Sequence, residues 1–455
     1  MRPRSLSEVA AAVEGAVEGD DVRVTHLVTD SREAAPGALF FALRGEHHDG
    51  AQYVGDAFTR GAAAAVVGEG ASAPGPAVRV PSTADALLRL AADERARDLA
   101  GVRLIAITGA NGKTSTKDLA AAVLGARFRT HSSPGSYNNE IGLPVTLLTA
   151  PEGVEVVVAE MGARRVGDVR LLCEVARPDV AVVTNVGLAH LEVFGSWDAI
   201  LAASAEPIAA LRPGGVAVLA ADDPEVVRLP RPDGVRVVTF GRSPGSDVRA
   251  EAVELDAEGR ASFELVAGDA RETIELAVPG EHMVSNALAA AACGLELGLT
   301  AAECAAGLKG ARISRWRMET FTTPDGVRVV NDAYNANPES MAAALRAARW
   351  MARGARLIAV LGPMAELGPV ADQEHERVGE LAARLRVDRV ITVGADARRI
   401  AAAAVREGVE PEHVVSFDDP ADALADVRAC ADPGDVVLFK ASRVAALDRL
   451  AEALR

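Results

Sequence analysis

Apolar runs that end at glycine recur along the chain and alternate with segments of helical periodicity. VRLIAITG (102–109) is such a run, and the helical pattern of 113–124 follows it. VEVVVAEMG (154–162), the helical pattern of 166–176 and DVAVVTNVG (179–187) repeat this order. Runs that are apolar at every position are typical of strands buried on both faces of a parallel sheet. The pattern therefore predicts a central α/β unit.

The two ends of the chain carry related patterns. The first part mixes helical stretches with short strand-like runs, ALFFAL, AAAAVV and AVRV, which indicates a small α/β domain. The central unit is followed by a β-rich interval (235–280) and an alanine-rich helix (282–297). After it, four apolar runs alternate with helical segments, as in a Rossmann-like domain. These runs are VRVVND, ARLIAVLG, VDRVITVG and DVVLFKAS.

The length of the chain agrees with this division. At roughly 100–200 residues per domain, 455 residues predict about three domains. We place them at residues 1–100, 101–313 and 314–455. The expected fold class is α/β, with a parallel sheet in the middle domain and a Rossmann-like domain at the end.

Charge and cysteine content narrow the classes of partner. Lys plus Arg is 48 and Asp plus Glu is 64, a net charge of −16, whereas proteins that bind nucleic-acid backbones carry excess positive charge. We therefore expect no nucleic acid partner. The four cysteines are widely spaced in apolar surroundings, which favours buried thiols in a reducing compartment. No uncharged apolar run reaches the length of about 18 residues that a membrane span needs, so a cytoplasmic protein is expected.

The strongest local signal is TGANGKTST at residues 108–116, between the first central strand and its helix. We call this segment the phosphate loop. Glycines let the backbone approach a phosphate, N–H groups at a helix N-terminus face the anion, a lysine supplies charge and a hydroxyl can reach Mg²⁺. The loop is shorter than the usual P-loop, because Ile107 stands where the first glycine of G-x-x-x-x-G-K is required. The residues expected around the phosphates are Gly109, Asn111, Gly112, Lys113, Thr114 and Ser115.

Two polar residues follow the next two central strands. Glu160 ends VEVVVAE, and His190 lies in TNVGLAHLE. Ligands of open α/β sheets bind at the carboxyl edge of the strands, and Mg²⁺ prefers carboxylate oxygen. Either residue alone is also compatible with a solvated acid or a hydrogen-bonded loop histidine, but the phosphate loop upstream favours a shared site. Thr114, Glu160 and His190 are therefore the candidate metal ligands.

Segments distributed over nearly the whole chain resemble those of the Mur ligase family. The phosphate loop alone indicates only a wider superfamily that includes folylpolyglutamate synthase, whereas YNANPESM and NNEIGLP are specific to the branch that adds D-alanyl-D-alanine. The segments that carry the resemblance are 28–50, 108–117, 136–148, 159–168, 184–196, 279–291, 315–321, 331–345 and 440–443.

The resemblance implies a three-domain, ATP-dependent amide ligase with Mg²⁺ as a further cofactor. In the family, the carboxylate of a UDP-linked muramyl peptide becomes an acyl phosphate, which an amine attacks; here the amine is a D-amino-acid dipeptide or another amine. The catalytic residues implied are Lys113, Glu160, His190 and Arg317. By motif position, Asn286 and Asp332 contact adenine and ribose, and Arg317 the γ-phosphate. The substrate residues implied are Ser31 and Arg32 for uridine, Asn138 and Asn139 for the muramyl peptide, and Tyr334, Asn335 and Asn337 for the amine.

The sequence departs from the family at one position of chemical importance. The family pattern I-A-x-A-K-x-E contains a lysine that is carbamylated and bridges a second Mg²⁺, but Ser204 stands at that position. The chain has only four lysines, and none lies between Lys117 and Lys309. Pro207, which follows, removes a helix hydrogen bond and is expected to kink the helix. Ala220 and Pro363 replace a usual Asn and a usual acid.

These departures leave three functions open. The first is the peptidoglycan-precursor ligase with an altered second metal site. The second is a related ligase that forms an amide on another substrate, for instance in specialised metabolism. The third is a nucleotide-binding protein with little ligase activity. We expect a monomer in each case.

Overall fold

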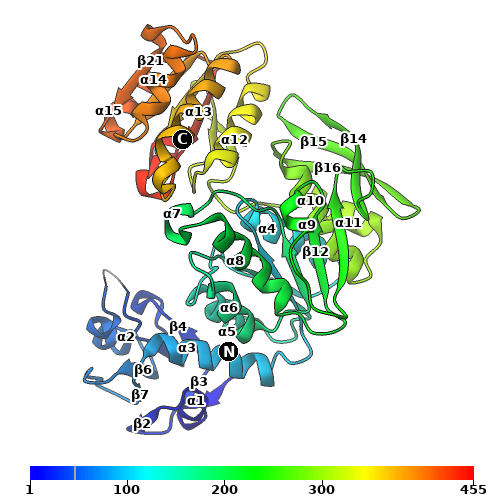
Figure 1. Ribbon diagram of the computed structural model, residues 1–455. Helices are drawn as coiled ribbons and strands as arrows, with labels where there is room; N and C mark the ends of the chain where they lie inside the picture. The colour runs from blue at the N-terminus through cyan, green and yellow to red at the C-terminus, as the bar shows by residue number, and fades with distance from the viewer. Residues whose placement is uncertain (46–47) are drawn as a thin grey trace.

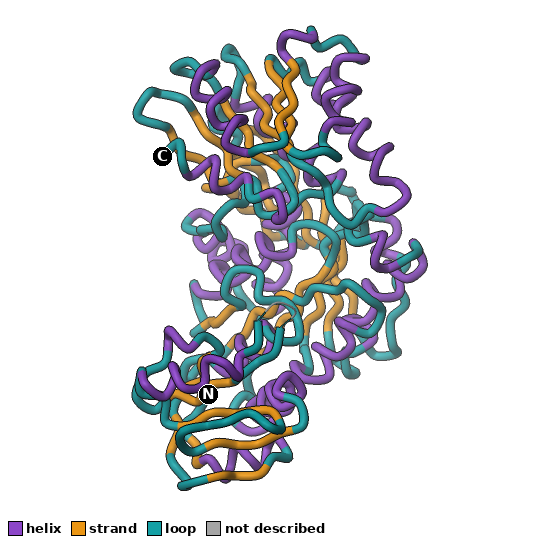
Figure 2. Tube along the Cα trace, turned by 90° about the vertical axis from the view of Figure 1, so that its left-hand side faces the viewer, coloured by secondary structure: helices purple, strands orange, loops and turns teal. Residues whose placement is uncertain are grey.

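The chain folds into three lobes in a row, each built around one main sheet (Figures 1 and 2). The computed structural model describes residues 1–45 and 48–455. Residues 46 and 47, which fall within one segment of the family resemblance (28–50), lie outside the described residues. The mixed α/β architecture predicted from the apolar runs is confirmed.

The N-terminal lobe contains a five-stranded sheet in the order β2-β7-β6-β5-β4. Its strands are β2 (Ala16–Glu18), β4 (His26–Val28), β5 (Ala38–Phe41), β6 (Ala64–Gly68) and β7 (Ala77–Val80). All neighbours are parallel except β2 and β7. The N-terminal lobe also contains a two-stranded sheet of β1 (Arg4–Ser5) and β3 (Arg23–Val24). Its helices are α1 (Leu6–Val13) and α2 (Val54–Thr59).

Helix α3 (Thr83–Arg97) joins the N-terminal lobe to the central one. Ser82 caps its N-terminus by accepting a hydrogen bond from the Asp85 N–H at 3.2 Å. The helix packs against α5 (Gly142–Leu148) and α6 (Asp168–Ala176) of the central lobe. One apolar core therefore runs from the first lobe into the second.

The central lobe holds a nine-stranded sheet in the order β16-β15-β14-β13-β12-β11-β8-β10-β9. The strands are β8 (Arg103–Thr108), β9 (Thr130–Ser132), β10 (Val156–Glu160), β11 (Val180–Val183), β12 (Val216–Ala220), β13 (Arg236–Gly241), β14 (Val248–Leu255), β15 (Arg260–Ala267) and β16 (Ala270–Pro279). Neighbours from β9 to β14 are parallel, and β14, β15 and β16 are antiparallel. The helices around this sheet are α4 (Lys113–Gly125), α7 (Leu191–Phe194), α8 (Trp197–Ala209), α9 (Pro224–Val227), α10 (Met283–Glu296) and α11 (Ala301–Lys309).

The C-terminal lobe holds a six-stranded sheet in the order β17-β18-β22-β19-β20-β21, in which only β17 and β18 are antiparallel. The strands are β17 (Glu319–Thr322), β18 (Arg328–Asn331), β19 (Leu357–Leu361), β20 (Arg389–Val393), β21 (Val414–Phe417) and β22 (Val436–Lys440). The helices are α12 (Pro338–Met351), α13 (Ala371–Arg384), α14 (Arg398–Arg406), α15 (Pro420–Cys430) and α16 (Leu447–Glu452). Short 3-10 turns supply the remaining helical residues.

The sheets belong to separate lobes, but the apolar cores do not separate. One buried cluster contains Ile107 and Val183 of the central sheet together with Met341 and Leu345 of α12. The Trp350 indole N–H also donates to the Asp256 carbonyl at the β14–β15 turn, at 2.8 Å. The domain boundaries at residues 100 and 314 stay predictions. Among the described residues, no helix combines the length and apolar character needed to cross a bilayer.

Candidate active site

The phosphate loop lies between β8 and the N-terminus of α4, at the carboxyl edge of the central sheet. Gly109 has φ +134° and Gly112 has φ +80°, which side chains rarely tolerate. A Cβ at Gly109 would lie 2.1 Å from Thr184 Oγ1, and one at Gly112 would lie 2.4 Å from Asn286 Oδ1. Glycine is therefore required at both positions, and the Asn286 side chain lies directly against the loop.

Lys113 closes the loop by donating from Nζ to the carbonyls of Gly109 at 2.6 Å and Ala110 at 3.2 Å. Burial lowers the pKa of this ammonium, the Glu160 carboxylate opposes that effect, and the Arg317 guanidinium adds to it. Lys113 therefore interacts electrostatically with one anion and one other cation. The charge set is suited to a phosphate and its counterion.

Two buried oxygens of the candidate site, Thr114 Oγ1 and Glu160 Oε2, have no hydrogen-bond partner among the residues that the structure describes. Both residues are 1% exposed. The other carboxylate oxygen, Glu160 Oε1, accepts from Asn138 Nδ2 at 2.8 Å. A buried carboxylate oxygen without a donor is costly unless a cation approaches it. This pair of oxygens therefore fits Mg²⁺, a hard cation that binds oxygen. Ser115, the next loop residue, is also buried.

The C-terminal lobe presents a second group of charges. The Arg317 guanidinium stacks 4.3 Å from the centroid of the Tyr334 ring. Lys440 Nζ lies 2.6 Å from Asp332 Oδ2 and donates to the Asn335 carbonyl at 2.7 Å. Burial lowers the pKa of Lys440, the Asp332 carboxylate opposes this, and Arg317 adds to the lowering. Arg317 thus influences lysines of both lobes.

Direct contacts join these two groups of residues. Asn337 Nδ2 donates to Asn111 Oδ1 at 2.8 Å, and the Tyr334 hydroxyl contacts the Ser136 hydroxyl. Asn337 also caps α12, because its Oδ1 accepts from the Ser340 N–H at 2.9 Å. The loop expected to face the amine is therefore held against the phosphate loop.

His190 lies at the start of α7, where the central and C-terminal lobes meet (Figure 1). Its Nδ1 contacts the Glu366 carboxylate, and Glu366 also accepts from Arg164 at 2.5 Å. Burial lowers the pKa of His190, which favours the neutral ring; Glu366 opposes the lowering and Lys113 reinforces it. Of the three predicted metal ligands, Thr114 and Glu160 offer unpaired oxygens, whereas His190 is engaged through one ring nitrogen.

Ser204 offers no substitute for a carbamylated lysine. Its hydroxyl donates to the Ile200 carbonyl within α8, at 2.8 Å. The Glu206 carboxylate is also occupied, since it accepts from the N–H groups of Gly167 at 2.5 Å and Arg170 at 2.9 Å at the start of α6. Helix α8 continues past Pro207 to Ala209.

Some predicted residues lie elsewhere or have local structural roles. Ser31 and Arg32 are in the N-terminal lobe, where Ser31 Oγ donates to Asp56 at 2.7 Å and Arg32 pairs with Asp30 at 2.5 Å. Asn139 Oδ1 accepts from the Gly142 N–H at 2.9 Å, at the start of α5. The substrate roles of these residues stay predictions.

The structure also shows two residues at the site that the sequence analysis did not select. Lys117, 2% exposed, donates to the carbonyls of Ser133 at 2.8 Å and Gly135 at 2.9 Å, and so anchors the segment before Asn138. Its signal was its rarity, as one of four lysines. Glu366 had no such signal, because its importance comes from a contact between lobes.

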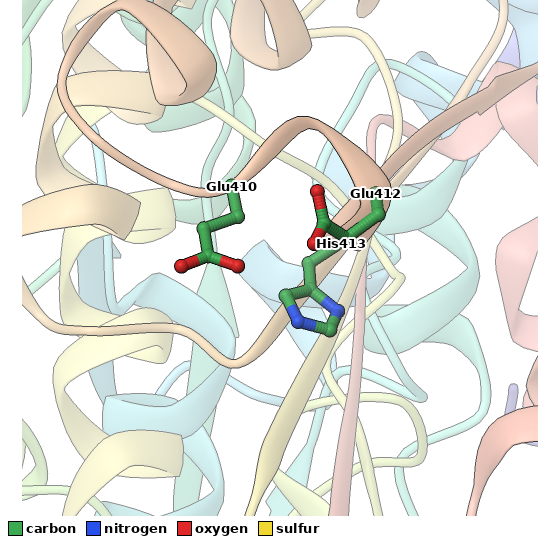
Figure 3. Close-up of side chains that lie close together, drawn as sticks. All are labelled: Glu410, Glu412 and His413. Carbon is green, nitrogen blue, oxygen red and sulfur yellow. The ribbon is translucent and has the colours of Figure 1, made fainter.

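A separate group of potential ligand atoms, from Glu410, Glu412 and His413, lies on an exposed turn of the C-terminal lobe (Figure 3). The ligand atoms lie within 4.8 Å of one another. The turn precedes β21, at the edge of the sheet, and shares no residue with the predicted site. Exposed acidic groups of this kind are common without a metal, so it is not included in the site.

Family models match all three lobes. The Mur ligase family catalytic domain matches residues 23–95, the Mur ligase middle domain residues 107–294, and the Mur ligase glutamate ligase domain residues 316–443. A UDP-N-acetylmuramoyl-tripeptide–D-alanyl-D-alanine ligase of Mycobacterium tuberculosis (strain H37Rv) is 41% identical, over 99% of this chain and 97% of the relative.

Solved structures agree over the same length. MurF from Acinetobacter baumannii has a TM-score of 0.87 at 30% identity and covers 100% of this chain and 99% of its own. MurF ligase from Thermotoga maritima, in complex with ADP, has a TM-score of 0.80 at 29% identity and covers 94% of this chain and 96% of its own. The chain belongs to the Mur ligase family.

Proposed function

We propose that this chain is the ATP-dependent ligase that joins D-alanyl-D-alanine to a UDP-N-acetylmuramoyl tripeptide in peptidoglycan precursor synthesis. The observation that carries this proposal is the match, over nearly the full length of both chains, to a ligase of that name. The two alternative functions, an amide ligase of specialised metabolism and a nucleotide-binding protein with little ligase activity, are not favoured by the comparisons.

Residues of the central and C-terminal lobes would have different roles in this reaction. Lys113 and the N-terminus of α4 would hold the phosphates of ATP, with Asn286 beneath the loop. Arg317 would neutralise charge on the transferred phosphoryl group from the opposite lobe, where the buried Lys440 pairs with the partly exposed Asp332. The charges of Lys113, Arg317 and Lys440 support these roles, which come from the resemblance to the family.

Mg²⁺ is the metal whose chemistry fits the oxygens of Thr114 and Glu160. When bound, this ion would neutralise phosphate charge during phosphoryl transfer. Asn138 holds the Glu160 carboxylate through Oε1, which leaves Oε2 for the metal. The second cation site of the family does not fit this chain, because Ser204 and Glu206 are both committed to backbone groups.

The position of the loop that contains Tyr334, Asn335 and Asn337 supports the proposal that this loop binds the amine substrate. Its contacts with Asn111 and Ser136 place it next to the phosphate loop, where an amine could meet an activated carboxyl group. Ser31 and Arg32 would bind the uridine nucleotide in the N-terminal lobe. The division at residues 100 and 314, the monomeric state and the cytoplasmic location are part of the proposal.

The test measures ADP release with UDP-muramyl-tripeptide, with and without D-alanyl-D-alanine, together with the mass of the product. We expect release to depend on both substrates and the product to gain the mass of the dipeptide less one water. Release that does not respond to the dipeptide, while another amine supports it, would overturn the proposed acceptor. The absence of release with any amine would overturn the ligase assignment.

A further inference from the structure

The C-terminal lobe places an acidic side chain on the histidine of the central lobe. Glu366 lies in the loop after β19, and its carboxylate contacts His190 Nδ1. The backbone takes part as well, because the Glu192 N–H donates to the Glu366 carbonyl at 3.0 Å. The contact is partly sheltered, with 28% of the His190 side chain and 27% of the Glu366 side chain exposed.

The loop that contains Glu366 is fixed from within its own lobe. The Met364 N–H donates to His375 Nε2 at 2.9 Å, and the Ala365 N–H donates to Ser442 Oγ at 2.9 Å. His375 is 2% exposed and Ser442 is 3% exposed. Ser442 Oγ also donates to the Ala336 carbonyl at 3.3 Å, in the loop that faces the phosphate loop. One buried serine therefore ties the Glu366 loop to the proposed amine loop.

The backbone at the contact is unusual on both sides. His190 has φ +60° and Glu366 has φ +62°, a region that non-glycine residues seldom adopt. Such conformations persist where surrounding contacts impose them, and they concentrate at functional sites. Nearby, Gly368 has φ +58°, and a Cβ there would lie 3.1 Å from Glu192 Cβ. A side chain at Gly368 would be strained by this φ and would require the segment of Glu192 to move by a few tenths of an ångström.

The contact itself decides which ring nitrogen is free. The Glu366 carboxylate lies against His190 Nδ1, and a carboxylate accepts hydrogen bonds but does not donate them. The His190 Nδ1 must then carry the proton. In the neutral ring, Nε2 is left with its lone pair, as in metal-binding histidines oriented by a carboxylate.

We propose that Glu366 is a positioning residue: its carboxylate, carried by the C-terminal lobe, accepts the Nδ1 proton of His190, fixes the orientation of the ring and leaves its Nε2 lone pair free for a ligand. This inference rests on the proposed function. It also makes the orientation of His190 depend on the approach of the C-terminal lobe. In a site that has Ser204 in place of the usual lysine, His190 would thereby be held in its orientation by a residue of the C-terminal lobe.

The first test reads the tautomer of His190 without turnover. Protein labelled with ¹⁵N in its eight histidines is studied by long-range proton–nitrogen correlation, and His190→Gln identifies the resonance. We expect the Nδ1–H tautomer in the parent and loss of that preference in Glu366→Ala. Glu366→Gln keeps an acceptor oxygen and is expected to retain the tautomer. An Nε2–H tautomer in the parent, or an unchanged one in Glu366→Ala, would overturn the proposal.

The second test separates positioning from simple attachment of the lobes. Glu366→Ala is expected to lower kcat by about 10–100-fold with a small change in the KM for ATP. Glu366→Gln should recover much of the loss. Arg164→Ala removes the other side chain that pairs with Glu366 and should keep the His190 tautomer. If Arg164→Ala and Glu366→Ala lower kcat equally, Glu366 only attaches the lobes to each other, and the proposal is overturned.

The matched control is Asp372→Asn, which breaks an exposed pair with Arg399 in the same lobe and should change neither readout. A melting curve for each variant checks folding. Because the tautomer is read without substrates, an inactive parent would count against the proposed function and leave the tautomer result to decide the role of Glu366.

Discussion

The Lys113 ammonium is the cation on which the proposed nucleotide site depends most directly. It is held by two carbonyls of its own loop and lies within electrostatic reach of Glu160 and Arg317. Lys113→Ala should lower ATP turnover by about 10²-fold or more, because the phosphates lose their charge partner, and should leave the fold intact, because the side chain is not part of an apolar core. ADP release and a thermal melt measure the two effects. Turnover within about twofold of the parent would refute the phosphate-loop assignment.

The cysteine side chains give a second prediction at this scale. Burial raises the pKa of Cys173 and Cys293 to about 12 and that of Cys304 to about 11, so these thiols stay protonated at neutral pH. Cys430 is only partly buried. A thiol reagent at pH 8 should modify at most one residue in the native protein and four in denaturant. Cys430→Ser should remove the native reaction. Rapid modification of two or more native thiols would contradict this assignment.

Individual residues also show where sequence reasoning ends. Lys113, Thr114 and Glu160 were recognisable because glycine spacing and the end of a strand fix their position from local sequence alone. Glu366 was not, since its role depends on a contact with His190, which is 176 positions away in the chain. No periodicity encodes a contact between lobes.

At the scale of elements, the turn between β8 and α4 requires glycine at residue 112. Gly112→Ala would place a methyl group 2.4 Å from Asn286 Oδ1 at φ +80°, which costs about 1–2 kcal/mol for the backbone conformation alone. We expect a lower free energy of unfolding and weaker binding of ATP, measured by denaturant titration and calorimetry. Gly125→Ala, near the end of the same helix, meets no atom within 4 Å and should be neutral or slightly stabilising. Equal behaviour of the two variants would contradict the steric argument.

Helix α8 carries the clearest chemical departure from the family. Ser204→Lys would introduce the lysine expected from the family pattern, whose amine can take up carbon dioxide as a carbamate, so turnover should rise several-fold in bicarbonate buffer if the missing carbamate weakens the site. The helix continues past Pro207, and the present hydroxyl forms only a bond to the Ile200 carbonyl. ADP release with and without bicarbonate measures the effect, and Ser204→Met serves as a control of similar length without the amine. No gain, together with full activity of the parent, would mean that another group replaces the carbamate.

The elements themselves followed closely from the apolar runs. VRLIAITG, VEVVVAEMG and DVAVVTNVG form β8, β10 and β11, because a continuous apolar run with a glycine after it marks a strand buried on both faces. The β-rich interval also forms strands, but it extends the central sheet as β13 to β16. That order could not be predicted, since strand neighbours are chosen by packing between distant segments. The short strand β9 lacks an apolar run and gave no signal.

For the whole molecule, the decisive feature is that the proposed nucleotide site draws on residues of two lobes. Lys113 belongs to the central lobe, whereas Arg317 precedes β17 of the C-terminal lobe and stacks on Tyr334. The Arg317 guanidinium nevertheless contributes to the lowered pKa of Lys113, which is a repulsion between cations of the two lobes. Two like charges brought together by folding repel each other, and a polyanion between them removes the repulsion. Binding of ATP is therefore expected to favour the approach of the lobes.

A double-mutant cycle tests this shared site. Lys113→Ala and Arg317→Ala should each lower kcat/KM by about 10²-fold or more, because each removes a cation from the transferred phosphate. Since both act on the same charge, the loss in the double variant should be much smaller than the product of the single losses. Arg399→Ala, at an exposed pair in the C-terminal lobe, should combine with Lys113→Ala without coupling. If the losses for Lys113 and Arg317 multiply as fully as in that control, the two residues act on separate events, and the lobes do not enclose one phosphate site.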